Sequence, residues 1–87
     1  MSITVELFGI PRERAGVAET QAEGARLDQV LADLARRFPR LAADCFARDG
    51  LQKGYLANLN GQRFVSDPAT VIRPGDQLLI LSADAGG

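Results

Sequence analysis

The chain has 87 residues, 46% of them hydrophobic, and a formal net charge of −1 at pH 7, so we expect one folded domain with a small core and neither disorder nor a nucleic-acid-binding surface. The sequence has no histidine and one cysteine, Cys45, which argues against Ser/His or Cys/His catalysis, an intrachain disulfide and a Cys/His metal site. No apolar run approaches the ~20 residues of a membrane span and the N-terminus lacks the layout of a signal peptide, which predicts a cytoplasmic protein.

The N-terminal third of the chain predicts two strands. Residues 2–8 alternate between odd-numbered apolar side chains and an opposite face that ends with Phe8, which is typical of a half-buried strand. Residues 12–16 are polar and end in glycine, and we expect a loop there. Residues 17–22 predict a shorter, more polar strand at an edge of the sheet. Together the two strands suggest a hairpin.

After Gly24 the apolar period changes to that of a helix. One stripe consists of Leu27, Val30, Leu31, Leu34 and Phe38. This spacing predicts an amphipathic helix that Pro39 ends. We expect Arg36, Arg37 and Arg40 to form a solvated helix end. Residues 41–46 predict a second short helix, in which Cys45 is a small buried hydrophobe.

The C-terminal third predicts strands again. Residues 55–59 lead into Asn60-Gly61, the pair favoured in tight hairpin turns, and residues 62–65 form the return strand. Residues 70–72 are too short to classify. Residues 77–81 are apolar on both faces, which is typical of a central strand.

The expected order is two strands, one main helix and three strands. One amphipathic helix covers one face of a sheet, so a mixed sheet of four to five strands packed on that helix is the simplest arrangement. A last strand beside the first would be parallel to it. This predicts an α+β fold, the ubiquitin-like β-grasp roll, at residues 1–81, followed by a flexible tail at residues 82–87.

The tail ends in Gly86-Gly87. A carboxylate is a poor electrophile, so its conversion to a thiocarboxylate requires activation, usually as an acyl-adenylate made in the ATP site of another protein. Residues without a Cβ pass through a narrow channel easily, which is what Gly86 and Gly87 supply. Once formed, the thiocarboxylate on Gly87 is a nucleophile that needs no side chain of this protein. A tail with this chemistry fits a chain that has no evident catalytic side chain.

Motifs over nearly the whole chain match one known family. They are Phe8-Gly9, Arg12-Glu13, Gly16, Phe38-Pro39, Asn58, Pro74-Gly75-Asp76 and Ala85-Gly86-Gly87. With these motifs the chain resembles the MoaD/ThiS sulfur carriers, especially the small subunit of molybdopterin synthase. The resemblance implies that a ubiquitin-activating-type adenylyltransferase, using ATP with magnesium, adenylates and thiolates the terminal glycine. It also implies sulfur delivery to a larger subunit in molybdopterin biosynthesis, by a chain that binds no cofactor and is not itself an enzyme.

Other functions fit the same fold and tail. The molybdopterin subunits of this family usually carry Pro-Pro where this chain has Ser82-Ala83. Carriers of the same family feed cysteine, methionine, thiamine or thio-metabolite biosynthesis, and these pathways are alternatives. A ubiquitin-like protein modifier is a further alternative, although Lys53 is the one lysine on which chains could be built. A β-grasp interaction module whose glycines are incidental is a third.

Strand alternation also predicts a docking face. If the odd-numbered residues of the first strand face the helix, then Phe8, Leu79, Leu81 and Phe64 form an exposed apolar patch near the root of the tail. In the family that this chain resembles, the partners dock on this face. A register shifted by one residue would invert the assignment. Asp84 is a candidate contact for a basic groove on the activating enzyme.

Overall fold

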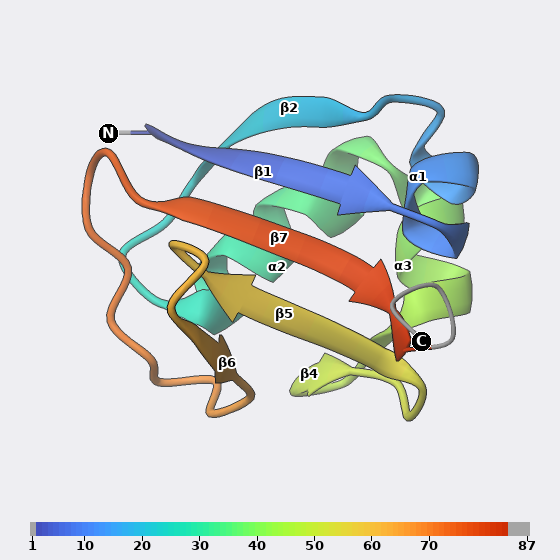
Figure 1. Ribbon diagram of the computed structural model, residues 1–87. Helices are drawn as coiled ribbons and strands as arrows, with labels where there is room; N and C mark the ends of the chain where they lie inside the picture. Colours follow the sequence, from blue (N-terminus) through green and yellow to red (C-terminus); the bar gives the residue numbers. More distant parts are fainter. Residues whose placement is uncertain (1, 84–87) are drawn as a thin grey trace.

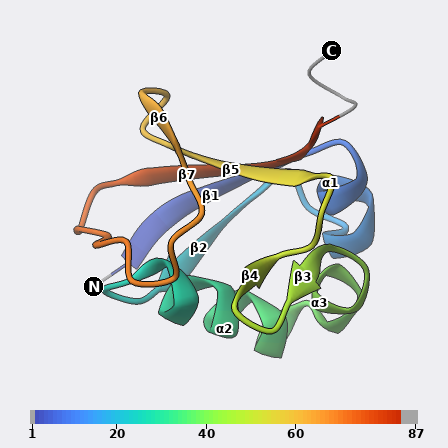
Figure 2. The same cartoon turned by 90° about the horizontal axis from the view of Figure 1, so that it is seen from below.

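The computed structural model describes residues 2–83, which form a five-stranded mixed sheet with its helices on one side (Figures 1 and 2). The strands of this sheet are β1 (Ser2–Phe8), β2 (Glu19–Glu23), β5 (Tyr55–Leu59), β6 (Arg63–Val65) and β7 (Gln77–Ser82). Their spatial order is β2-β1-β7-β5-β6, with β1 and β7 parallel and the other neighbours antiparallel. The predicted β-grasp arrangement, with the last strand beside the first and an edge strand at β2, is confirmed.

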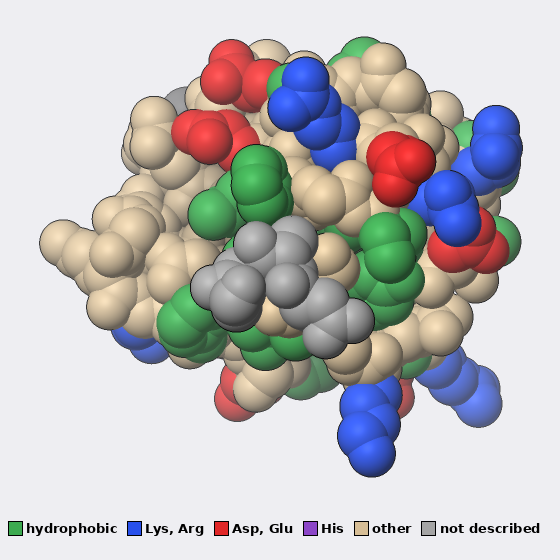
Figure 3. All heavy atoms as spheres, turned by 45° about the vertical axis from the view of Figure 1, so that its right-hand side comes forward, with side chains coloured by type: hydrophobic (Ala, Val, Ile, Leu, Met, Phe, Trp, Pro, Cys, Tyr) green, Lys and Arg blue, Asp and Glu red, His purple; other side chains and the backbone are tan. Residues whose placement is uncertain are grey.

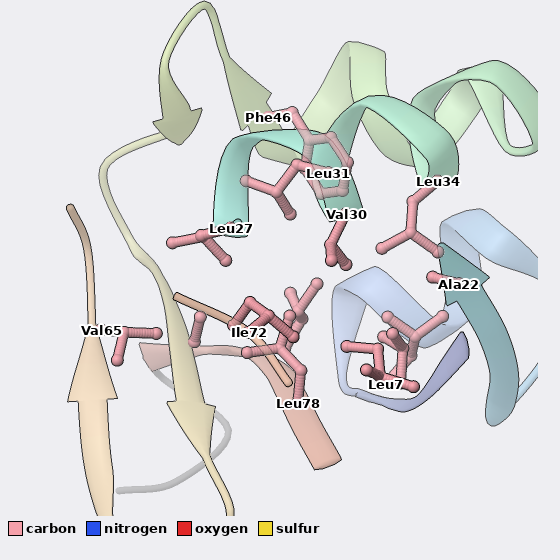
Figure 4. Close-up of a cluster of buried hydrophobic side chains, with 14 of the residues drawn as sticks. Leu7, Ala22, Leu27, Val30, Leu31, Leu34, Phe46, Val65, Ile72 and Leu78 are labelled. Carbon is pink, nitrogen blue, oxygen red and sulfur yellow. The ribbon is translucent and has the colours of Figure 1, made fainter. Parts of the chain in front are cut away.

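The core lies between the sheet and the helix α2 (Leu27–Arg37) (Figure 4). Alternation in β1 and β7 directs every second side chain toward α2, as predicted. The resulting inward-facing residues of these two strands are Ile3, Val5, Leu7, Leu78 and Ile80, none more than 3% exposed. Because a helix stripe and two central strands bury apolar surface together, this contact stabilises the fold through the hydrophobic effect.

Two local signals are confirmed at the ends of elements. Asn60 and Gly61 have φ angles of 58° and 68°, the positive values that a tight hairpin turn between β5 and β6 requires. Pro39 ends α2 as expected and also begins the next helix, α3 (Pro39–Cys45), because the first turn of a helix tolerates a residue without an N–H. Cys45 is fully buried, as predicted.

The prediction of a loop at residues 12–16 is wrong. Residues 12–15 belong to a short helix, α1 (Ile10–Ala15), that lies between β1 and β2. Pro11 occupies its first turn, and Gly16 ends it with an N–H that donates to the Arg12 carbonyl. A helix of six residues is too short to be stable alone. It is held here by packing against α3 and by an ion pair between Arg14 and Asp44.

Two further segments differ from expectation, and the structure describes a third that the sequence left unclassified. The edge strand β2 begins two residues later than predicted and ends one residue later. A small second sheet, β3 (Phe46–Ala47) with β4 (Gly50–Leu51), was not predicted because each strand has only two residues, and the helix predicted at residues 41–46 is wrong for Phe46, which lies in β3. In the unclassified segment at residues 70–72, Ile72 is buried while Val71 pairs with Arg26 as an isolated bridge.

Candidate functional site

The side of the sheet turned away from the helices, here called the open face, carries an apolar row at the end where β7 finishes. The strand register places Phe8 opposite Leu81 and Leu81 opposite Leu56. Phe8 is 49% exposed and Leu56 is 39% exposed, while Leu81 between them is partly exposed. Figure 3 shows hydrophobic side chains gathered at this end of the molecule. We call these three residues the apolar row.

The next row across the open face mixes apolar and polar side chains. Leu79 lies between Glu6 and Asn58, and Phe64 lies opposite Asn58 with 63% of its surface exposed. The Oδ1 atom of Asn58 is shielded from solvent and has no hydrogen-bond partner among the described residues. A groove of about 660 Å³ between β4 and β6 is also lined by Phe64, so apolar surface continues from the open face into this groove.

The predicted patch residues all lie on the open face, but Phe64 is not a direct cross-strand neighbour of the other three. Phe8 and Leu81 are neighbours, whereas Phe64 is separated from Leu79 by Asn58. Leu56 was not predicted, although alternation in the strand at residues 55–59 turns it to the same side as Asn58. Its contact with the other members becomes evident only from the register of β5 against β7.

The predicted start of the tail at residue 82 is wrong. Ser82 belongs to β7, lies opposite Tyr55 and is only 6% exposed. The N–H of Ala83 donates to the Gly54 carbonyl over 2.7 Å. The body of the protein therefore extends through Ala83. The predicted site residues Asp84, Gly86 and Gly87 lie outside the described residues.

One charged cluster joins α2 to the edge strand β2. The carboxylate of Asp33 is buried, accepts the Glu23 N–H over 2.9 Å and pairs with Arg36 and Arg37. Arg37 also donates to the Gln21 carbonyl. The Glu23 N–H and the two arginines lower the pKa of Asp33. Arg36, Arg37 and Arg40 are exposed, as predicted for a solvated helix end, and Arg37 in addition binds a backbone carbonyl of the edge strand β2.

A second carboxylate organises the turn before β7. Asp76 accepts the Arg73 N–H over 2.8 Å and the Asn60 side-chain amide over 3.0 Å. These hydrogen bonds lower the pKa of Asp76. Asn60 in turn accepts the Gln77 N–H over 2.8 Å. The Gly-Asp motif before the last strand thus fixes where β7 begins and which of its residues reach the apolar row.

Two observations bear on chemistry within residues 2–83. No group of three or more His, Cys, Asp or Glu side chains is arranged to hold a metal ion there. Burial raises the pKa of the Cys45 thiol, so this cysteine is a poor nucleophile in the folded protein. Among the same residues, no helix has the length and apolarity needed to cross a membrane.

The sheet order, the parallel central pair and the helix on one face define a ubiquitin-like β-grasp protein. The structure is similar to SAMP1 from Haloferax volcanii, with a TM-score of 0.84 and 23% identity over 100% of both chains. It is also similar to the Amycolatopsis orientalis BexX/CysO complex, with a TM-score of 0.82 and 26% identity over 98% of this chain and 99% of that chain. A putative molybdopterin converting factor, subunit 1, from Pyrococcus furiosus has a TM-score of 0.76 and 23% identity over 94% and 97% of the two chains.

The family model of the ThiS family matches residues 5–87, so this chain belongs to the ThiS family. Members of this family are small carrier proteins and not catalysts. No curated protein sequence matches the chain. The resemblance to MoaD/ThiS carriers that the motifs indicate is confirmed.

Proposed function

We propose that this protein is a sulfur carrier whose C-terminal Gly87 is adenylated and then converted to a thiocarboxylate by a ubiquitin-activating-type partner enzyme. One observation supports this most directly. A ThiS-family domain presents its apolar row beside the end of β7, the strand that leads into the terminal Gly86-Gly87. A partner that covers this row lies beside the end of β7, from which the sequence continues to the carboxylate on which the partner acts.

The chemistry belongs to the partner, and the carrier supplies the reacting group. The partner's ATP, held with magnesium, reacts with the Gly87 carboxylate to give an acyl-adenylate and pyrophosphate. Hydrosulfide supplied by a sulfur donor then attacks the acyl carbon, and the bond to AMP breaks as the C–S bond of the thiocarboxylate forms. In this proposal Gly86 lets the backbone enter a narrow site, Asp84 contacts a basic groove, and Phe8, Leu56, Leu79, Leu81 and Phe64 form the docking surface. Because the reaction consumes ATP, we place it in the cytoplasm.

For the sulfur acceptor, two candidates follow from different observations. The motifs of the sequence favour the large subunit of a molybdopterin synthase, and the similar Pyrococcus furiosus chain is described as a putative molybdopterin converting factor. The 26% identity to a chain of the BexX/CysO complex favours instead a carrier that serves another sulfur pathway, such as cysteine, methionine, thiamine or thio-metabolite biosynthesis. Sulfur transfer from the isolated thiocarboxylate to each purified acceptor would distinguish the two.

Intact-mass measurement tests the proposal. The purified chain is incubated with the adenylyltransferase of its own organism, ATP, magnesium and a sulfur source. We expect the mass increase for one oxygen replaced by sulfur, and none for a variant that lacks Gly87, whose far-ultraviolet circular dichroism should be unchanged. An unchanged mass with only high-molecular-weight adducts would identify a protein modifier instead. If neither protein gains sulfur, and the unsubstituted chain and the variant without Gly87 bind the partner with equal affinity, the protein would be an interaction module.

A further inference from the structure

The last described residues are tied to a turn that precedes β5. Ser82 pairs with Tyr55 at the end of β7, and the Ala83 N–H donates to the Gly54 carbonyl over 2.7 Å. In Figure 1 the loop between β4 and β5 lies beside the end of β7. We call the Ala83–Gly54 hydrogen bond the latch.

The turn that supplies the acceptor is itself fixed. The Tyr55 N–H donates to the Gln52 carbonyl over 3.2 Å, and Gly54 has a φ of 97°. A positive φ at the third position of a β-turn calls for glycine. Gln52 anchors the turn, since its N–H donates to the Cys45 carbonyl over 2.8 Å and its side chain donates to the Phe46 carbonyl over 3.0 Å. The Gly54 carbonyl is therefore held in place from the end of α3.

We propose that residues 52–55 are a positioning element that sets how far the terminal glycine reaches from the docking surface. This inference rests on the proposed function. With Ala83 latched, four residues follow it, and four extended residues span at most about 14 Å. The adenylating centre of a partner that covers the apolar row must then lie within about 14 Å of Ala83. The latch fixes the point from which this length is measured.

Amide hydrogen exchange of the isolated carrier tests the latch without any partner. We expect the Ala83 amide to exchange at least about tenfold more slowly than an unfolded amide, because a bonded N–H must open before it exchanges. In the variant Gln52→Ala, which loosens the turn, the Ala83 protection should fall while that of Ile80 in mid-strand is kept. Exchange of the Ala83 amide at the unfolded rate in the unsubstituted protein would overturn the proposal.

Three variants test whether the latch sets the reach. Ala83→Pro lacks the N–H and places its ring against the Gly54 carbonyl, so it breaks the latch. Ala83→Gly keeps the N–H donor and is the matched control. We expect Ala83→Pro to lower kcat/KM for thiocarboxylate formation about threefold to tenfold, the range for one hydrogen bond. Deletion of Ala85 shortens the tail by one residue and should lower kcat/KM on the order of a hundredfold.

The decisive protein combines Ala83→Pro with the Ala85 deletion. If the latch sets the reach, releasing Ala83 restores the lost residue, and the combined variant should be roughly tenfold more active than the deletion alone. If the hydrogen bond only stabilises the fold, the two losses multiply, and that result would overturn the proposal. The experiment starts from the unsubstituted chain with its adenylyltransferase. Absence of any mass change there would refute the proposed function, whereas the exchange measurement would still report on the latch.

Discussion

Phe8 is the aromatic member of the apolar row, and its replacement by alanine tests the docking surface. A phenylalanine side chain buries about 200 Å² when covered, and Phe8 is 49% exposed, so roughly 100 Å² is open to a partner. At about 25 cal/mol per Å², covering this area contributes at most about 2.5 kcal/mol. Ordering of side chains at the interface offsets part of this. A net loss of about 1.4 kcal/mol corresponds to a tenfold weaker complex.

The assay is ATP–pyrophosphate exchange by the adenylyltransferase with the carrier as variable substrate. Phe8→Ala should raise the KM for the carrier about tenfold and leave kcat nearly unchanged, because Phe8 contributes to binding and not to the reacting group. Val71→Ala is the matched control. Val71 is 57% exposed but pairs with Arg26 and lines a hollow with Asp76, the residue before the other end of β7. Equal KM values for the two variants, or a loss in kcat alone, would refute the assignment of the apolar row.

Three further predictions concern stability and reactivity. Asp33→Asn should lower the free energy of unfolding in urea by about 1–2 kcal/mol at pH 7, because the Glu23 N–H and two arginines lose a charged partner. Since folding lowers the pKa of Asp33, this contribution is complete above about pH 4 and is lost as the pH falls further; a difference that stays constant as the pH falls below about 4 would contradict it. Asp76→Ala should lower the free energy of unfolding by about 1–2 kcal/mol, measured in the same way, because the Arg73 N–H loses its acceptor; no change would contradict the role of this turn. Cys45 should resist alkylation by iodoacetamide until the protein is unfolded in urea, because it is fully buried; reaction at the same rate in both states would contradict this.

The elements that were predicted well carry long local patterns. Alternation over residues 2–8 and 77–81, the stripe of α2 and the Asn60-Gly61 turn each depend on neighbours in the chain. The elements that were missed are short. α1 has six residues and the strands β3 and β4 have two each, so their stability comes from distant contacts, such as those of α1 with α3.

The candidate site was likewise predicted only in part from the sequence. Strand alternation was sufficient to place Phe8, Leu79 and Leu81 on the open face, because the side-chain period of a strand is two. Alternation does not say which residues of different strands become neighbours. The addition of Leu56 to the apolar row, and the separation of Phe64 from Leu79 by Asn58, required the register between strands.

The sequence by itself determined the fold class, the buried face of each long element and the terminal glycine pair, because these follow from composition and from short-range periodicity. Only the tertiary structure decided that β7 continues through Ser82 and that Ala83 is bound to Gly54. It also decided that Asp33 and Arg37 cover the backbone of β2. The physical reason is that these hydrogen bonds join residues at least ten positions apart, and such contacts form only when the sheet and helices pack together.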